Sequence, residues 1–232
     1  MTLSVDSWTN LTNHPIVGAA VDEHLLLLED TLGTPHTGEF MATMIMSAAA
    51  TAQRDLGCKV AAVVTDNASN MKSARTICEQ NGASFITYPC LAHCLNNLVK
   101  DLMADKGRGE VLKAVTEVIV KFRNIQKLMA GLSNQGAPRP PLAADTRWGS
   151  QLSVLVYYNY WWSRMAQVAA SELPPADMVR RTLENVTISR ATVDLIALLD
   201  PVCKALSLSE ASDTHVGMGL EIVHELDRKS VV

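Results

Sequence analysis

The feature that most constrains the fold is a change in hydrophobic period along the chain. In the first 30 residues, short stretches alternate between apolar and polar side chains, which is typical of strands. Residues 3–8, 16–21 and 24–28 are the three predicted strands, and the turn-like segment NLTNHP follows the first. Because these strands are short and closely spaced, they predict an antiparallel meander.

Helical spacing then alternates with short apolar runs. Residues 38–55 form a predicted amphipathic helix, with Thr37 as its cap and Gly57 as its stop. Residues 59–65 form a buried parallel strand, 67–80 a second helix and 84–88 a further strand. A meander joined to strand–helix–strand units predicts an α/β, ribonuclease-H-like mixed sheet, in which the first and fourth strands are neighbours.

From Cys90 onward the pattern is helical throughout. Leucines recur at helical spacing over residues 91–102, and a longer apolar stripe covers 112–132. The segment 134–142 contains a glycine and three prolines, so it is a predicted loop, and further helices are predicted over 148–171, 177–185 and 189–208. We therefore expect a ribonuclease-H-like core over 1–104 and an all-helical insertion region, truncated in this chain, over 105–232.

Composition limits the environment and the class of partner. Of the 232 residues 48% are hydrophobic, and no uncharged apolar run is long enough to span a bilayer or to form a secretory signal. The five cysteines are odd in number and lie within periodic segments, so we expect reduced thiols. These features predict a nuclear or cytoplasmic protein that is not secreted and has no membrane partner. Because the net charge is −4, contact with nucleic acid would need a local basic patch.

Two acidic residues are the candidates for chemistry. Asp6 lies inside a predicted strand, where an acid is disfavoured, although it could simply face solvent near the strand end. Asp66 follows the AAVV strand at its carboxyl end, where sites of α/β sheets lie, although it could simply cap the next helix. On adjacent strands the two carboxylates would converge and repel unless a cation neutralised them. Oxygen ligands favour Mg²⁺ or Mn²⁺, the ions of nucleases and other phosphoryl-transfer enzymes.

Four motifs in order carry a resemblance to a known family. LSVDSWTN, VVTDNASNM, YPCLAHCLNNLVKDL and DTRWGS resemble segments of hAT-family transposases and of a related transposase-like domain of unknown function. The resemblance covers residues 1 to about 155. It implies that Asp6 and Asp66 are the first two metal ligands of a DDE-type triad holding Mg²⁺ or Mn²⁺. It also implies that DNA is the partner, with His93 near the active site.

The same resemblance implies contacts with nucleic acid. Trp148 would handle a DNA strand or stabilise a hairpin, and Arg147 and Asn70 are the further expected nucleic-acid contacts. His93 shares a helical face with two asparagines, which could instead form a buried polar cluster. Cys90, His93 and Cys94 also permit a zinc interpretation, but structural zinc needs four ligands and no second pair stands at finger-like spacing.

An aromatic run follows the last motif. It could stack on bases, with Arg139, Arg147 and Arg164 near phosphates, but core packing is the favoured interpretation because five residues on one helix point several ways. The run consists of Tyr157, Tyr158, Tyr160, Trp161 and Trp162.

The chain departs from the family pattern at the third acid. That residue is a glutamate beyond the insertion, and no motif marks Glu210, Glu221 or Glu225 as its counterpart. The family's N-terminal zinc finger and its C-terminal dimerisation region, the route to a homo-oligomer, have no match here. We therefore expect a truncated or decayed chain without transposition activity. One alternative is a domesticated, non-enzymatic module that binds DNA or protein. Another is an unrelated α/β enzyme, although phosphate loops, GxSxG and dinucleotide fingerprints are missing from the sequence.

Overall fold

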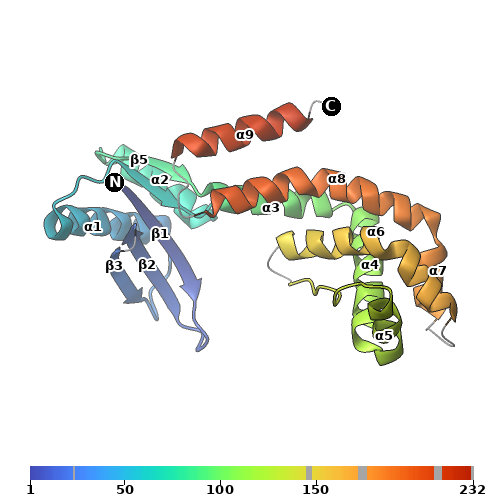
Figure 1. Cartoon of the computed structure of the whole chain (residues 1–232). Coiled ribbons are helices and arrows are strands. Elements are labelled where there is room, and N and C mark those ends of the chain that lie inside the picture. Colours follow the sequence, from blue (N-terminus) through green and yellow to red (C-terminus); the bar gives the residue numbers. More distant parts are fainter. Residues whose placement is uncertain (23, 145–147, 172–176, 212–215, 231–232) are drawn as a thin grey trace. The chain divides into compact units, whose positions relative to one another are not determined.

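The chain divides into two compact units, Met1–Cys94 and Leu95–Val232. The computed structural model describes residues 1–22, 24–144, 148–171, 177–211 and 216–230, whose helices and strands are drawn in Figure 1. Arg147, one of the expected nucleic-acid contacts, lies outside the described residues.

A five-stranded mixed sheet forms the frame of the first unit. Strands β1 (Thr2–Thr9), β2 (Pro15–Val21) and β3 (His24–Asp30) pair antiparallel in sequence order. Strands β4 (Ala62–Thr65) and β5 (Ile86–Pro89) extend the sheet beyond β1 in parallel. The order β3-β2-β1-β4-β5 confirms the predicted α/β class, the meander with added parallel strands, and the adjacency of the first and fourth strands (Figure 1).

Two helices of this unit form where the sequence predicts them. In α1 (Gly38–Leu56) the Thr37 side chain accepts a hydrogen bond from the Phe40 backbone N–H at 3.2 Å, as an N-cap does. The helix ends at Gly57, whose φ of 63° lies in the left-handed region that glycine adopts without a steric cost. Helix α2 (Ser69–Gln80) begins two residues later than predicted, because residues 67 and 68 form the turn that leaves β4.

The core of the first unit lies between one face of the sheet and the two helices. Leu3 and Val5 of β1 are buried there, whereas the alternate residues Ser4 and Asp6 are exposed on the other face. None of the described helices of this unit supplies residues that bury this second face. The buried side chains of the core include Val17, Val63, Met41, Ile45, Met71, Ala74 and Cys78.

Within the described residues, the long regular elements of the second unit are all helices, as predicted, and residues 137–143 form a loop. Helix α3 (Leu91–Met103) follows β5 directly and runs from the first unit into the second. The further helices are α4 (Lys106–Asn124), α5 (Gln126–Asn134), α6 (Trp148–Ser171), α7 (Asp177–Glu184), α8 (Val186–Ser209) and α9 (Val216–Ser230). Among the described residues, no helix combines the length and the apolar character needed to cross a membrane.

The long apolar stripe over 112–132 does not form one helix. It divides at Ile125, whose extended backbone (φ −88°, ψ 109°) ends α4 and begins α5. The apolar spacing is not kept across the break: Phe122 and Leu128 are buried, whereas Ile125, within the predicted stripe, is exposed. Helix α9 lies beyond the last predicted helix. Periodicity therefore predicted part of the buried side of α4, but neither the break nor the burial of Leu128 in place of Ile125.

Candidate functional site

The parallel pairing of β1 and β4 brings the two candidate acids together. The last residues in register are Val5 and Thr65, and the next residue along each strand is Asp6 and Asp66 respectively. Paired strands lie about 4.8 Å apart, so the backbones of the two acids begin at about that separation. The carboxyl edge of the central strand pair therefore holds an acid pair, Asp6 and Asp66.

Each carboxylate of the acid pair is held by a local backbone bond. Oδ1 of Asp6 accepts from the Ser7 backbone N–H at 2.8 Å, and Oδ1 of Asp66 accepts from the Ala68 backbone N–H at 2.7 Å. The Asp66 bond spans two residues, as in an Asx turn, and Asp66 does not cap α2 because the N-cap position of that helix is Ala68. Both side chains therefore have a fixed position on the backbone and keep a second oxygen for another ligand.

A glycine lies beside Asp6 on the exposed face of the sheet, and a tryptophan ring lies over that glycine. Gly18 pairs with Asp6 across β1 and β2, and it carries no side chain toward that face. The indole of Trp8 lies over Gly18, because a Cβ built there would meet the ring at 2.8 Å. Trp8 is thus held next to the strand position that carries Asp6, on the exposed side of the sheet.

A buried arginine fixes the chain around Asp66. The guanidinium of Arg75, on α2, donates to the Thr65 hydroxyl at 2.6 Å, to the Asp66 carbonyl at 2.7 Å and to the Asn67 side-chain oxygen at 3.0 Å. All three acceptors are neutral oxygens, so the positive charge is not cancelled by these contacts. Arg75 was not among the predicted site residues, because helical spacing does not show which loop a buried polar side chain bonds to.

Asn70 is tied to the protein itself. Its side-chain Nδ2 donates to the His36 carbonyl at 3.0 Å, and its Oδ1 accepts from the Met71 backbone N–H at 2.9 Å. The first of these bonds joins the start of α2 to the loop before α1. Both polar atoms of Asn70 thus have partners within the first unit, and its role in binding nucleic acid stays a prediction.

His93 lies four residues after the end of β5. It is exposed on the first turn of α3, between the half-buried Cys90 and Cys94. Burial raises the pKa of the Cys94 thiol, the neighbouring Cys90 raises it further, and Arg75 acts in the opposite direction. All five cysteines are free, and the described residues contain no group of three or more histidine, cysteine or acidic side chains placed to hold a metal.

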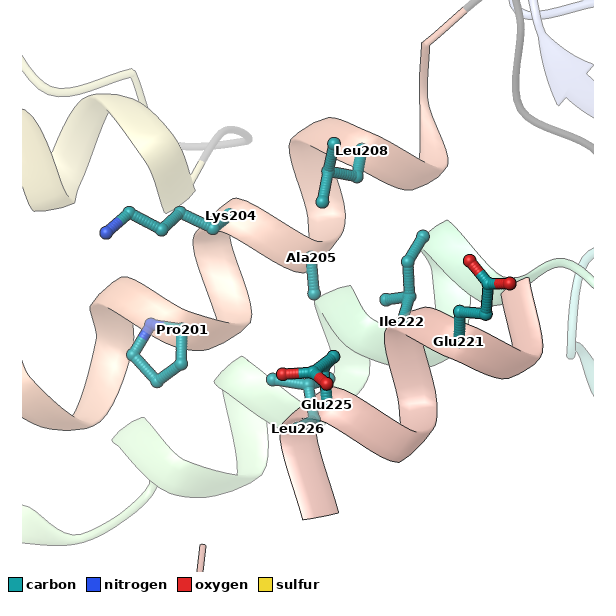
Figure 2. A pocket seen from close by; sticks show the side chains of 8 residues that line it. All are labelled: Pro201, Lys204, Ala205, Leu208, Glu221, Ile222, Glu225 and Leu226. Carbon is teal, nitrogen blue, oxygen red and sulfur yellow. The ribbon is translucent and has the colours of Figure 1, made fainter. Parts of the chain in front are cut away.

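The remaining predicted residues belong to the second unit. Trp148 is the half-buried first residue of α6, and no hydrogen bond or ring contact of it is found within the described part of the chain. Glu221 and Glu225, on α9, lie at the rim of an apolar groove between α8 and α9, with Leu208 and Ile222 inside it (Figure 2). Glu210 caps the end of α8.

The two carboxylates of the acid pair are suitable ligands for a divalent cation, although they supply only part of a metal-binding site. Its donors are two carboxylates with free oxygen valences, and Mg²⁺ and Mn²⁺ prefer oxygen ligands. A bound ion would neutralise the repulsion between the two charges, and in DNA cleavage it would stabilise charge on phosphate oxygens. Asp6 and Asp66 are the residues of this chain that would hold it.

Comparison with known proteins adds no relative to this picture. No model of a protein family matches the chain, and no curated protein matches it significantly.

Proposed function

We propose that this chain is a transposase-derived, ribonuclease-H-like domain whose acid pair binds a divalent cation. The ancestral activity would be metal-dependent DNA cleavage and strand transfer, with Mg²⁺ or Mn²⁺ as the ion and DNA as the partner. The order β3-β2-β1-β4-β5 supports this proposal, since it is the arrangement that the four motifs lead one to expect.

The observation that carries the proposal is the register of β1 with β4. The pairing of Val5 with Thr65 sets Asp6 and Asp66 side by side, although 59 residues of chain separate them in sequence. Two carboxylates that converge are unfavourable unless a cation neutralises them. Arg75 brings one positive charge to the backbone of Asp66, and a divalent cation held by the acid pair would offset both carboxylates.

We further propose that the chain alone does not cleave DNA. The family triad contains three acids, and two ligands bind a metal weakly and position it poorly. No sequence motif marks Glu210, Glu221 or Glu225 as the third ligand.

Binding of Mn²⁺ tests the proposed site. We expect the electron paramagnetic resonance signal of free Mn²⁺ to fall on addition of the protein, and to be restored when Asp6→Asn and Asp66→Asn are combined. The matched control is Glu29→Gln, which removes an exposed carboxylate from β3 of the same sheet. Equal binding by the wild type and the double variant would refute the metal site.

A cleavage assay tests the proposed loss of activity. Nicked and hairpin DNA incubated with the protein and Mn²⁺ should remain intact. Robust cleavage that Asp66→Ala abolishes would show instead that the chain is an active nuclease.

A non-enzymatic interaction module is the second candidate function. The observation that favours it is a groove with exposed aromatic rings on α6, far along the sequence from either acid. Under this alternative, Asp6→Ala and Asp66→Ala leave DNA binding intact, whereas loss of binding in those variants would count against it.

A further inference from the structure

A groove runs along one side of α6 within the second unit. It has a volume of about 530 Å³ and lies between the proline-rich residues 139–141 and the helix. Its lining includes Arg139, Pro141, Tyr157, Tyr160 and Trp161. Trp148 lies one helical turn before the lining residue Leu152 and is not itself part of the groove wall.

The aromatic run divides into structural rings and free rings. Tyr158 is buried, and Trp162 donates from Nε1 to the Leu183 carbonyl at 2.9 Å. Tyr157 is also buried, and its hydroxyl donates to the Pro138 carbonyl at 2.6 Å, which holds the proline-rich segment against α6. These three rings confirm that part of the run is packing.

Tyr160 and Trp161 remain available in the groove. Tyr160 is 70% exposed, and its ring meets that of Trp161 edge to face, with 5.1 Å between the centroids. The partner ring restricts the positions that Tyr160 can take, so a large aromatic face is held toward solvent.

The charges at the groove are positive. Arg139 is exposed and forms no ion pair within the described part of the chain, and the Arg164 guanidinium lies 4.6 Å from the centroid of the Trp161 ring. None of the described residues that line the groove is acidic. Arg139 and Arg164 are thus cations that could contact an anion here, in a chain whose net charge is −4.

We infer that this groove binds single-stranded DNA, with a base stacked on Tyr160 and a phosphate held by Arg139. Aromatic rings that accept bases, combined with cations that follow the backbone, are the two elements by which proteins bind single strands with little sequence preference. The choice of DNA as the nucleic acid rests on the proposed function, whereas the groove, its rings and its charge do not.

Fluorescence anisotropy of a labelled oligothymidylate, titrated with the full chain, tests this inference. We expect binding that weakens with salt, and a loss of affinity on the order of tenfold in Tyr160→Ala, since stacking of one base contributes about 1–3 kcal/mol. Tyr160→Phe should retain most of the affinity because it keeps the ring. Arg139→Gln should weaken binding and make it less sensitive to salt.

Two neighbouring substitutions serve as controls. Asn159→Ala changes an exposed residue of α6 beside Tyr160, and Arg190→Gln removes an exposed cation from α8. Both should leave the affinity unchanged. The inference is overturned if oligothymidylate does not bind, or if Tyr160→Ala and Arg139→Gln bind as the controls do. It is equally overturned if oligouridylate or a proline-rich peptide occupies the groove in preference to DNA.

The outcome is separable from that of the proposed metal site. If Mn²⁺ binds at the acid pair but oligothymidylate does not bind, the groove inference alone fails. If oligothymidylate binds through Tyr160 while Mn²⁺ does not bind, the metal proposal alone fails.

Discussion

Arg75 is the residue on which the geometry around Asp66 most depends. A guanidinium presents donors in a rigid fork, and here three of its bonds fix consecutive residues at the end of β4. Burying a cation is unfavourable unless its hydrogen bonds are made. The site therefore depends on α2 as well as on the two strands that carry the acids.

Replacement of Arg75 should destabilise the first unit and loosen the acid pair. We expect Arg75→Met to lower the free energy of unfolding by about 1–3 kcal/mol, because charged hydrogen bonds to residues 65–67 are lost. Urea denaturation measures the change, and Lys72→Met, at an exposed position of the same helix, is the control. Equal stability of the two variants would show that the three bonds contribute nothing net.

Removal of the hydroxyls of two adjacent tyrosines should change the stability of the protein in opposite directions. The buried Tyr158 hydroxyl makes no hydrogen bond within the described part of the chain, whereas the Tyr157 hydroxyl donates to Pro138. Tyr158→Phe should raise stability by about 1 kcal/mol by removing an unsatisfied polar group, and Tyr157→Phe should lower it by about 1 kcal/mol. Denaturation at neutral pH compares them, and a loss of stability in Tyr158→Phe would contradict the assignment.

The same burial makes stability depend on alkaline pH. Burial raises the pKa of Tyr158 to about 12, as it does that of Tyr157. The unfolded chain, with a tyrosine pKa of about 10, releases these protons first, so stability is full below about pH 10 and falls as pH rises toward 12. Denaturation midpoints across this range should fall less steeply in Tyr158→Phe, and an unchanged slope would argue against a buried hydroxyl.

At the scale of elements, a glycine sets how closely α5 and α6 approach. A Cβ at Gly131 would lie 2.8 Å from Cγ1 of the buried Val168. Although alanine favours helix, we expect Gly131→Ala to destabilise the protein by about 1–3 kcal/mol through this overlap. Thermal unfolding should show that Val168→Ala costs less in the Gly131→Ala background than in the wild type.

The control for this contact is Gly149→Ala. Apart from its chain neighbours and its own helix backbone, no atom of the described residues lies within 4 Å of a Cβ built at Gly149 near the start of α6, so the same substitution should be neutral or stabilising there. Strict additivity of the changes at Gly131 and Val168 would show that the two helices have room to separate.

The elements were predictable where local signals agreed. Alternation in β1 and β2, the cap at Thr37 and the stop at Gly57 each depend on a few neighbouring residues, and each prediction was confirmed. The break at Ile125 was not predicted, because an apolar stripe reflects burial and does not show where the backbone leaves the helix. Strand β4 is shorter than predicted: it begins at Ala62, and of the residues before it Val60 is buried whereas Lys59 and Ala61 are exposed.

The candidate site was predictable only in part. Asp6 and Asp66 were singled out because acids at strand positions are unusual, and their adjacency followed from the expected strand order. Arg75 could not be foreseen, because helical spacing does not tell which buried polar residue bonds to which loop. The groove on α6 could not be predicted, because the sequence does not show which of the five aromatic rings within residues 157–162 point into the protein. Only the packing of the helix decides that.

For the whole molecule, two separate cores imply that a destabilising core substitution affects mainly the unit that carries it. Ile45 is fully buried in the first unit and Phe122 in the second. We expect Ile45→Ala and Phe122→Ala each to cost about 2–5 kcal/mol, and to raise hydrogen exchange mainly within the unit that carries the change. Mass spectrometry of exchanged peptides measures this, and uniform exchange across both units would indicate a single cooperative core.

The position of Trp8 has a spectroscopic consequence. It is the sole tryptophan among residues 1–94, and its indole is held over Gly18, the strand partner of Asp6. A chain whose other three tryptophans are replaced by phenylalanine would thus fluoresce from one ring beside the acid pair. Because paramagnetic Mn²⁺ quenches nearby indoles whereas Mg²⁺ does not, the emission of Trp8 would report metal occupancy directly, without a label.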